Sequence, residues 1–178
     1  MIRLPETTGP LAADEARAAF DAILDGHCEP QDITRFLTDM SLRDESATEI
    51  AAAVQAMRAR MIPVKAPQGA IDVCGTGGDG AHSLNISTAV AIVVAACEVP
   101  VAKHGNRGIT SKSGSADVLE ALGVHTNITP EHSARVMDEI GICFLYAPVF
   151  HPGFARVAPI RKAIGQQTGG HFSPLAAY

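Results

Sequence analysis

The chain has 178 residues, of which 47% are hydrophobic and 19% are charged, and its formal net charge at pH 7 is -5. A hydrophobic fraction of this size supports one good-sized domain, or one domain with a small helical partner, and argues against a disordered chain. The acidic balance argues against a general nucleic-acid-binding surface, which needs an excess of positive charge.

The spacing of the cysteines and the length of the apolar stretches indicate in which cellular compartment the protein is expected. The chain has 4 cysteines, far apart and without a Cys-x-x-Cys pair, which is typical of reduced cytosolic thiols rather than of a zinc site or a disulfide framework. The most apolar stretch, residues 89–97, is too short to span a bilayer, and no signal peptide is visible. We expect a cytoplasmic protein without a membrane segment. We also expect all the cysteines to be small buried residues: Cys28, Cys74, Cys97 and Cys143.

Residues 10–61 predict a bundle of helices. Apolar residues recur at helical spacing from Ala13 to Leu24, and Gly26 predicts the end of this helix. Pro30 is typical of the first position of a second helix. Ser46 and Glu49 have the spacing of a capping box that opens a third. A partner-binding face is the alternative interpretation of these apolar stripes, and a helix-bundle core is the favoured one.

A linker divides the chain. Residues 63–69 contain two prolines and a glycine, which is typical of a hinge or linker. We therefore place a helical domain at residues 1–66 and a second domain at residues 70–178.

Beyond the linker, strands alternate with helices. Short apolar strands are predicted at residues 70–74, 99–102 and 142–146. Helices are predicted at residues 86–96, 115–122, 130–140 and 154–164. Thr129 has the role of an N-cap before Pro130, and Gly141 that of a stop. The helix at residues 86–96 is strongly apolar, so we expect it to be buried on most sides. The alternation predicts an α/β fold with a parallel sheet.

Two polar, glycine-rich segments, residues 75–83 and 103–115, follow predicted strands. Ligands bind beyond the carboxyl ends of the strands in open α/β sheets, and glycines let the backbone approach a ligand closely. Asn85 and Ser87 begin a helix, where free N–H groups and the helix dipole favour a phosphate. Helix capping is the alternative role for these two residues. The segments predict a site for a polyanion such as a sugar phosphate or pyrophosphate.

The glycine pattern has two other interpretations, which we rank lower. Residues 75–80 read Gly-Thr-Gly-Gly-Asp-Gly and formally match the dinucleotide-binding pattern G-x-G-x-x-G. The next strand ends in Lys103 and His104, with no acid placed to hold a ribose hydroxyl, and the helix begins several residues too late. A nucleoside-triphosphate P-loop fails because no Gly-Lys-Ser/Thr follows the glycines.

The second polar segment carries a cluster of candidate ligand-binding side chains. Lys103, Arg107 and Lys112 can neutralise phosphates. His104 and Asn106 can contact a second, uncharged or aromatic ligand. Each basic residue taken alone is more often a solvated surface group, but their clustering in one loop favours a function.

Two further residues keep two interpretations each. Asp79 can hold hydroxyls or, through water, a metal, or it can shape the turn. Arg161, on an apolar helix, can pair with a carboxylate ligand or with a local acid.

Four motifs together resemble the anthranilate phosphoribosyltransferase family. They are Asp72-Val-Cys-Gly-Thr-Gly-Gly-Asp79, Asn85-Ile-Ser-Thr88, Lys103-His-Gly-Asn-Arg107 and Ser111-Lys-Ser-Gly-Ser-Ala-Asp-Val-Leu-Glu-Ala-Leu-Gly123. The resemblance runs from about Leu11 to Gly165. It implies a small N-terminal helical domain and a parallel-sheet α/β phosphoribosyltransferase domain of the nucleoside phosphorylase-like type. It also implies phosphoribosyl pyrophosphate (PRPP) and Mg²⁺ bound between them, and a homodimer.

The resemblance implies the transfer of the phosphoribosyl group from PRPP to anthranilate in tryptophan biosynthesis, with release of pyrophosphate. This reaction depends on positioning and charge stabilisation, so no residue is assigned as an acid or base. Ser87 would bind magnesium. Anthranilate would contact Gly75, Asn106 and Arg161, with His104 and His151 along its path. PRPP would contact Gly75, Gly78, Asp79, Ser83, Asn85, Ile86, Ser87, Thr88, Lys103, His104, Gly105, Asn106, Arg107, Gly108, Ile109, Thr110, Ser111 and Ser115.

The chain departs from the family pattern at two places. Ser83-Leu84 replaces the usual Thr-Phe and keeps the hydroxyl. After Gly165 the similarity ends, and residues 166–178 form a divergent tail. We therefore expect a chain truncated to the N-terminal half of the family pattern, without the Asp-Glu pair that holds magnesium and with weak or absent turnover.

Such an incomplete α/β domain is expected to leave apolar sheet surface uncovered. The alternative functions are a non-catalytic remnant that binds a phosphate ligand or a partner subunit, and a pyrimidine nucleoside phosphorylase-like enzyme. The motif after Lys103-His104 differs from that of the phosphorylases.

Overall fold

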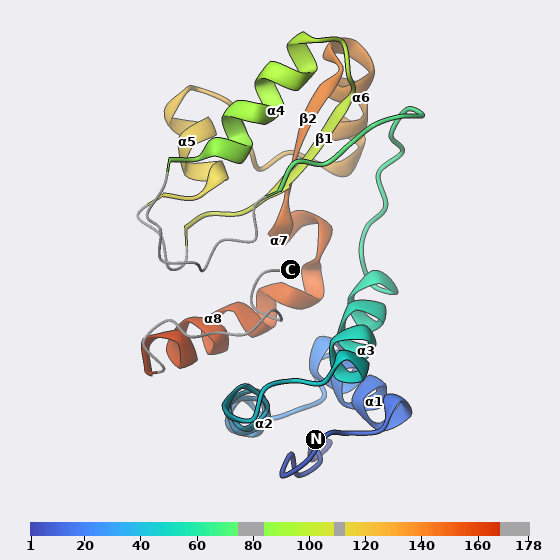
Figure 1. The fold of residues 1–178 in the computed structure, drawn as a ribbon, viewed down its shortest axis with the longest axis vertical. Helices are drawn as coiled ribbons and strands as arrows, with labels where there is room; N and C mark the ends of the chain where they lie inside the picture. The colour runs from blue at the N-terminus through green and yellow to red at the C-terminus, as the bar shows by residue number, and fades with distance from the viewer. Residues whose placement is uncertain (75–83, 109–112, 168–178) are drawn as a thin grey trace. The chain divides into compact units, whose positions relative to one another are not determined.

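The computed structural model describes residues 1–74, 84–108 and 113–167 (Figure 1). Within these ranges no helix is both long and apolar enough to cross a membrane. The chain forms two compact units, one of Met1–Met61 with His151–Tyr178 and one of Ile62–Phe150. The elements in chain order are α1 (Ala13–Leu24), α2 (Pro30–Leu42), α3 (Ala47–Arg58), α4 (Ile86–Ala96), β1 (Val101–Gly105), α5 (Ser115–Ala121), α6 (Pro130–Ile140), β2 (Ile142–Tyr146), α7 (Ala147–Phe150) and α8 (Pro152–Gln167).

The first unit is a helical bundle, which confirms the predicted core. The apolar faces of α1, α2 and α3 share one core, in which Phe36 and Met40 are completely buried. The rings of Phe20 and Phe36 meet edge to face, with centroids 5.8 Å apart. Val157 and Ile164 of α8 belong to the same core. The packing therefore groups α8 with the N-terminal helices, whereas the division into residues 1–66 and 70–178, based on the linker, stays a prediction.

Local signals begin and end these helices where the sequence predicts. Pro30 is the first residue of α2. Ser46 caps α3: its Oγ accepts a hydrogen bond from Glu49 N–H at 3.3 Å, and its own N–H donates to Glu49 Oε2 at 2.8 Å. The predicted capping box is therefore present.

Glu49 also joins three segments of the bundle. Its carboxylate is completely buried and accepts hydrogen bonds from Leu11 N–H at 2.9 Å and from the guanidinium of Arg43. Burial alone would raise the pKa of this carboxyl, but Arg43 and the N–H groups of Leu11 and Ser46 lower it to about 2. A single ionised group thus ties the N-terminal segment and the end of α2 to the start of α3.

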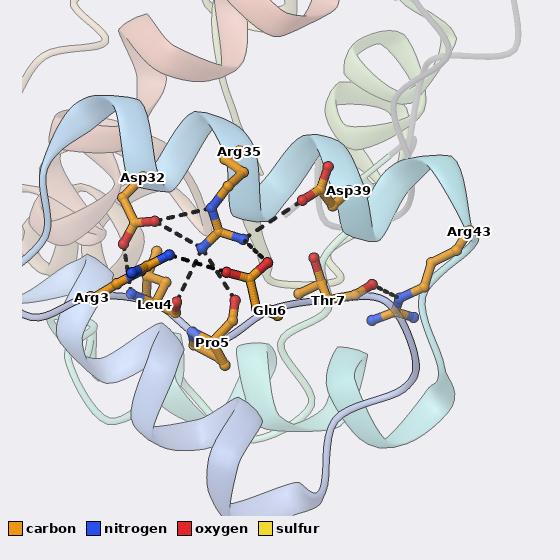
Figure 2. Close-up of polar contacts among 9 residues, drawn as sticks. All are labelled: Arg3, Leu4, Pro5, Glu6, Thr7, Asp32, Arg35, Asp39 and Arg43. Carbon is orange, nitrogen blue, oxygen red and sulfur yellow. Dashed lines mark hydrogen bonds and ion pairs between the residues drawn. The ribbon is translucent and has the colours of Figure 1, made fainter.

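A second polar cluster fixes the first residues of the chain along α2 (Figure 2). Asp32 Oδ2 accepts a hydrogen bond from Leu4 N–H at 2.6 Å, and Arg35 Nη2 donates to the carbonyl oxygens of Leu4 and Pro5 at 3.0 and 3.2 Å. Arg43 Nε donates to the carbonyl of Thr7 at 2.9 Å. Arginine side chains therefore satisfy backbone carbonyls that no strand or helix pairs.

The second unit contains a parallel pair of strands flanked by helices (Figure 1). β1 pairs with β2 in a register from Val101 opposite Ile142 to Gly105 opposite Tyr146. The third predicted strand, residues 142–146, is confirmed. The second is displaced from the predicted residues 99–102, because β1 starts after Pro100, which has no N–H to donate. β1 continues through Gly105 because pairing with β2 overrides the low strand propensity of its last residues.

The first predicted strand, residues 70–74, is reduced in the described residues to one bridge between Ile71 and Val101. Residues 75–83, which follow in the sequence, lie outside the described ranges. The parallel direction of this bridge agrees with the predicted α/β sheet.

Helix α4 has the predicted bounds but not the predicted burial. In the described part of the chain only Thr88 and Ala91 of this helix are buried, while Ile86 and Val93 are 61% and 62% exposed. The expectation of burial on most sides is therefore wrong: among the described elements α4 packs chiefly against β1 and β2, and most of its residues stay accessible. The signals of α6 are confirmed: Thr129 caps it, and Gly141 ends it at a φ of 73°.

The cysteines divide into two kinds. Cys28 and Cys143 are buried as predicted, and burial raises the pKa of Cys143 to about 11. Cys74 and Cys97 are exposed, so the prediction is wrong for these two thiols. Cys97 follows the uncovered helix α4, and Cys74 follows the single bridge at Ile71.

Replacing Glu49 tests the central polar contact of the helical bundle. Glu49→Gln is expected to lower the free energy of unfolding by roughly 3 kcal/mol at pH 7, because it leaves the Arg43 charge without its partner. In the parent chain the folded pKa lies below the ordinary value of 4.5, so this stabilisation is complete above pH 4.5 and is lost as the pH falls toward 2. Urea unfolding at several pH values measures both effects. Glu15→Gln, at an exposed position of α1, is the control, and equal stability of the two variants at pH 7 contradicts the assignment.

Candidate functional site

The predicted site residues that the structure describes gather where β1 ends and α4 begins. Lys103 lies in β1, and its Nζ donates two hydrogen bonds. One goes to Ser87 Oγ, in the first turn of α4, at 3.3 Å, and the other goes to the carbonyl of Val73 at 2.9 Å. Asn85, at the N-cap of α4, donates from Nδ2 to the carbonyl of Ser113 at 3.4 Å. Asn85 makes no side-chain capping bond to α4, so helix capping does not account for this side chain.

Lys103 is held inside the unit. Its residue is 3% exposed, and burial lowers the pKa of its ammonium. The interpretation of Lys103 as a solvated surface group is therefore wrong. Its two described hydrogen-bond acceptors, the Val73 carbonyl and the Ser87 hydroxyl, are uncharged. Lys103 is the middle residue of β1, and Asp72 is the nearby acid that acts on its pKa. A buried positive charge whose hydrogen-bond acceptors are neutral is suited to attracting an anion.

His104 has a different character from its neighbour. Burial lowers the pKa of its imidazole below the ordinary value of 6.5, so the ring is neutral at physiological pH. The backbone N–H of His104 donates to Asp72 Oδ1 at 3.1 Å, which ties β1 to the segment before the first glycine-rich loop. A neutral, half-buried ring fits the predicted contact with an uncharged or aromatic ligand better than a contact with phosphate.

Arg107 lies at the other extreme of exposure. Its side chain is 53% exposed and pairs with Glu120 at 2.8 Å and with Asp117 at 3.6 Å. Its Nε also donates to the hydroxyl of Tyr146 at 3.3 Å, the main cause of its raised pKa. Arg107 is therefore bound to acids of its own unit in this structure, and a phosphate would have to compete with them.

Asp117 closes the second glycine-rich segment. Its Oδ2 accepts hydrogen bonds from the N–H groups of Gly108 at 2.9 Å and Gly114 at 2.7 Å, and these bonds lower the pKa of its carboxyl. Gly114 itself must lack a side chain, because a Cβ there would lie 2.5 Å from the carbonyl oxygen of Asn106. That carbonyl also accepts hydrogen bonds from Ser115 Oγ and Ala116 N–H. The two ends of the segment are thus held together.

Asp117 is a residue that the sequence patterns do not single out. The available signal is its place as the third residue of a helix that follows a glycine, where an acid accepts hydrogen bonds from the N-cap backbone. That signal predicts a helix start but not the second bond, to Gly108, which comes from nine residues away.

The remaining predicted residues fall into three groups. His151 and Arg161 belong to the first unit, at the start of α8 and within it. Eight others lie outside the described residues, so their roles stay predictions: Gly75, Gly78, Asp79, Ser83, Ile109, Thr110, Ser111 and Lys112. Of the two other residues in the first turn of α4, Ile86 is exposed and Thr88 is buried.

The described residues contribute little to a metal site. Ser87, the predicted magnesium ligand, offers one hydroxyl oxygen, and that oxygen already accepts a hydrogen bond from the Lys103 ammonium. Among residues 1–74, 84–108 and 113–167, no group of three His, Cys, Asp or Glu side chains is arranged to hold a metal ion. These residues do not complete a magnesium site.

Comparison with known families matches both parts of the chain. The model of the helical bundle domain of a glycosyl transferase family matches residues 6–61, and the model of the a/b domain of a glycosyl transferase family matches residues 67–175. Among curated proteins, anthranilate phosphoribosyltransferase from Novosphingobium aromaticivorans is 58% identical over 168 residues, which are 94% of this chain and 51% of the relative. The enzyme from Sphingopyxis alaskensis is 56% identical over 92% of this chain and 49% of the relative. The chain thus spans about half the length of the curated relatives it matches.

Solved structures that resemble this chain are also anthranilate phosphoribosyltransferases. Anthranilate phosphoribosyltransferase from Thermus thermophilus matches with a TM-score of 0.81 and 42% identity, over 95% of this chain and 52% of that chain. The enzyme from Saccharomyces cerevisiae, in complex with PRPP and Mg, matches with a TM-score of 0.78 and 30% identity, over 87% of this chain and 47% of that chain.

Removing the Asp117 carboxylate tests the closure of the loop. In Asp117→Ala the amide hydrogens of Gly108 and Gly114 are expected to exchange with solvent about tenfold faster, because they lose a charged acceptor. Hydrogen exchange followed by NMR measures this change. Asp138→Ala, at an exposed position of α6 in the same unit, is the matched control. Unchanged exchange at both glycines in Asp117→Ala shows that another group closes the loop.

Proposed function

The chain belongs to the glycosyl transferase family that combines a helical bundle with an a/b domain, and on that premise we propose that it binds PRPP and serves its transfer to anthranilate. The observation that carries the proposal is the contact between the Lys103 ammonium and the first turn of α4. Curated relatives that match almost the whole chain are anthranilate phosphoribosyltransferases, which supports this pair of substrates.

The charges of the site suit PRPP. The ammonium of Lys103 and the N-terminal end of the α4 dipole both favour the oxygens of a diphosphate, and both belong to regular elements that hold their positions before a ligand arrives. Asn106 and Ser115, on the two sides of residues 109–112, are joined by a hydrogen bond from Ser115 Oγ to the Asn106 carbonyl, which fixes the chain after β1. PRPP is therefore bound largely by preformed geometry.

The reaction needs positioning more than acid or base chemistry. The anthranilate amine attacks C1 of the ribose while the bond from C1 to pyrophosphate breaks. The bonding electrons leave with pyrophosphate, and the amine loses a proton. Positive charge near the leaving group stabilises the developing negative charge. We propose that Lys103 supplies this charge, and that the neutral ring of His104 and the amide of Asn106 face anthranilate. We propose that Arg161 and His151 also contact anthranilate.

We also propose that Mg²⁺ accompanies PRPP, because the yeast enzyme has been solved in complex with both. Ser87 is the ligand proposed from this chain, and the other ligands would come from PRPP oxygens and from groups outside the described residues. When bound, the ion would neutralise charge on the diphosphate. We also propose that the protein is cytoplasmic and forms a homodimer.

Calorimetric titration of the purified chain tests the substrate. PRPP is expected to give heat of binding that increases when Mg²⁺ is present. Turnover, measured by the loss of anthranilate fluorescence, is expected to be weak or absent, because the chain spans about half the length of its relatives. A non-catalytic module that only binds a phosphate ligand would also give binding without turnover. Absence of heat under both conditions contradicts PRPP binding, and fast turnover contradicts the expected loss of activity.

Lys103→Met tests the role of the buried ammonium. The affinity for PRPP is expected to fall about tenfold or more, because a charge-assisted contact contributes about 1.5–3 kcal/mol. Lys65→Met, at an exposed position of the linker, removes the same charge from the chain without touching the site. Circular dichroism shows whether the Lys103 variant remains folded. Equal affinities of two folded variants rule out Lys103 as a PRPP-binding residue.

A further inference from the structure

Tyr146 is not among the residues predicted to contact a ligand, yet its hydroxyl contacts one of them. It is the last residue of β2, and its hydroxyl accepts a hydrogen bond from Arg107 Nε at 3.3 Å. The register of the two parallel strands places Tyr146 opposite Gly105, the last residue of β1. Arg107 follows Gly105 closely in the sequence. The strand pairing therefore brings the tyrosine beside the arginine at the point where the chain leaves the sheet.

The ring of Tyr146 is held by apolar packing. It packs against a small core in which every member is buried: Ala116, Leu119 and Phe144. An aromatic side chain with a polar tip typically buries its ring and keeps the hydroxyl at the edge of the apolar region, where it finds a hydrogen-bond partner. The hydroxyl therefore has a fixed position, and the long side chain of Arg107 is tied to it.

Glu120 fixes a second nitrogen of the same guanidinium. Its carboxylate lies 2.8 Å from Arg107 Nη2. The same carboxylate accepts a hydrogen bond from the hydroxyl of Thr126, a buried residue. Ion pairs on a surface are weak partly because two mobile side chains must be ordered. Since Thr126 already orders Glu120, this pair loses less side-chain freedom.

The third nitrogen of the guanidinium, Nη1, has a different environment. Its contact in the described part of the chain is with Asp117 Oδ1 at 3.6 Å, which is longer than a hydrogen bond. The other oxygen of Asp117 accepts hydrogen bonds from the N–H groups of Gly108 and Gly114. The two N–H groups of Nη1 therefore keep their hydrogen-bonding capacity for a ligand. Asp117 is the acid with which an anion at Nη1 would compete.

We propose that Tyr146 is a positioning residue, whose hydroxyl orients the Arg107 guanidinium so that Nη1 donates to a phosphate oxygen of bound PRPP. This inference rests on the proposed binding of PRPP. An arginine that is already held at two nitrogens loses less rotamer freedom when it binds an anion than one that is free in solvent. The tyrosine hydroxyl is neutral, so it directs the guanidinium without cancelling its charge, whereas Glu120 holds it and offsets the charge as well.

A double-mutant cycle tests the coupling between the two side chains. PRPP is titrated calorimetrically, with Mg²⁺ present, into the parent chain, Tyr146→Phe, Arg107→Met and the double variant. Tyr146→Phe keeps the ring and the net charge and removes only the hydroxyl. It is expected to lower the affinity about fivefold, because the hydrogen bond that orients the arginine is lost. In the Arg107→Met background the same change is expected to alter the affinity by less than about twofold.

The NMR signal of Arg107 Nε–H reports the orientation of the guanidinium without any ligand. In the parent chain this proton is expected to exchange with water about threefold more slowly than in Tyr146→Phe, because the hydroxyl holds it. The signal is assigned by its loss in Arg107→Lys, which keeps the positive charge. Thr34→Ala is the control, since it removes a neutral hydroxyl from α2 in the first unit. It is expected to change neither the exchange rate nor the affinity for PRPP.

Three results overturn the positioning role. They are equal PRPP affinities of the parent chain and Tyr146→Phe, equal Nε–H exchange in these two proteins, and a loss of affinity that persists in the Arg107→Met background. The last result would mean that the hydroxyl acts through the fold and not through Arg107. In each case PRPP binding by the parent chain leaves the proposed function intact.

The proposed function and the positioning role fail in different ways. If the parent chain binds no PRPP, the proposed function is wrong, and the same cycle is measured with inorganic pyrophosphate. Coupling between Tyr146 and Arg107 in that titration supports the positioning of the guanidinium for a phosphate group. Absence of coupling, or of any binding of pyrophosphate, overturns it.

Discussion

The second unit depends on a positive charge that is kept out of water. The Lys103 ammonium connects the segment after the Ile71 bridge, strand β1 and the first turn of α4 through the Val73 carbonyl and the Ser87 hydroxyl. Burying an ammonium is unfavourable unless hydrogen bonds replace its water. Here the replacements are neutral, so the charge itself is not cancelled by them. The same contact that aligns three segments also leaves an electric field at the sheet edge, and a bound anion would relieve the remaining cost.

Short-range signals in the sequence predict the helices well. The Ser46 and Glu49 capping box, Pro30, Thr129 and Gly141 each act within a few residues, and each has the predicted role. The predictions fail where contacts between residues far apart in the sequence determine the structure. The strand character of Lys103 and His104 comes from pairing with β2, and the placement of α8 comes from the core of the helical bundle.

In the candidate site, too, local patterns predict part of the structure and contacts between elements determine the rest. Glycines, hydroxyls and cations after predicted strands predict where a phosphate ligand would bind, since a parallel sheet brings these loops to one edge. The sequence does not reveal that Lys103 is buried, that Arg107 pairs with Glu120, or that Asp117 binds Gly108. Each of these facts depends on contacts between elements, which composition and spacing do not specify. The exposure of α4 is missed for a related reason: an apolar composition predicts burial, but whether neighbouring elements cover the helix depends on their packing.

The order of the units along the chain has a consequence for biosynthesis. The helical bundle is discontinuous: its first three helices precede the whole second unit, and α8 follows it. On the ribosome, α1, α2 and α3 emerge first but lack Val157 and Ile164, which occupy their core. The second unit, which is continuous from Ile62 to Phe150, is synthesised before the bundle can close. The earliest helices must therefore wait with an open core, and a chain that stops before α8 would release that core unfilled.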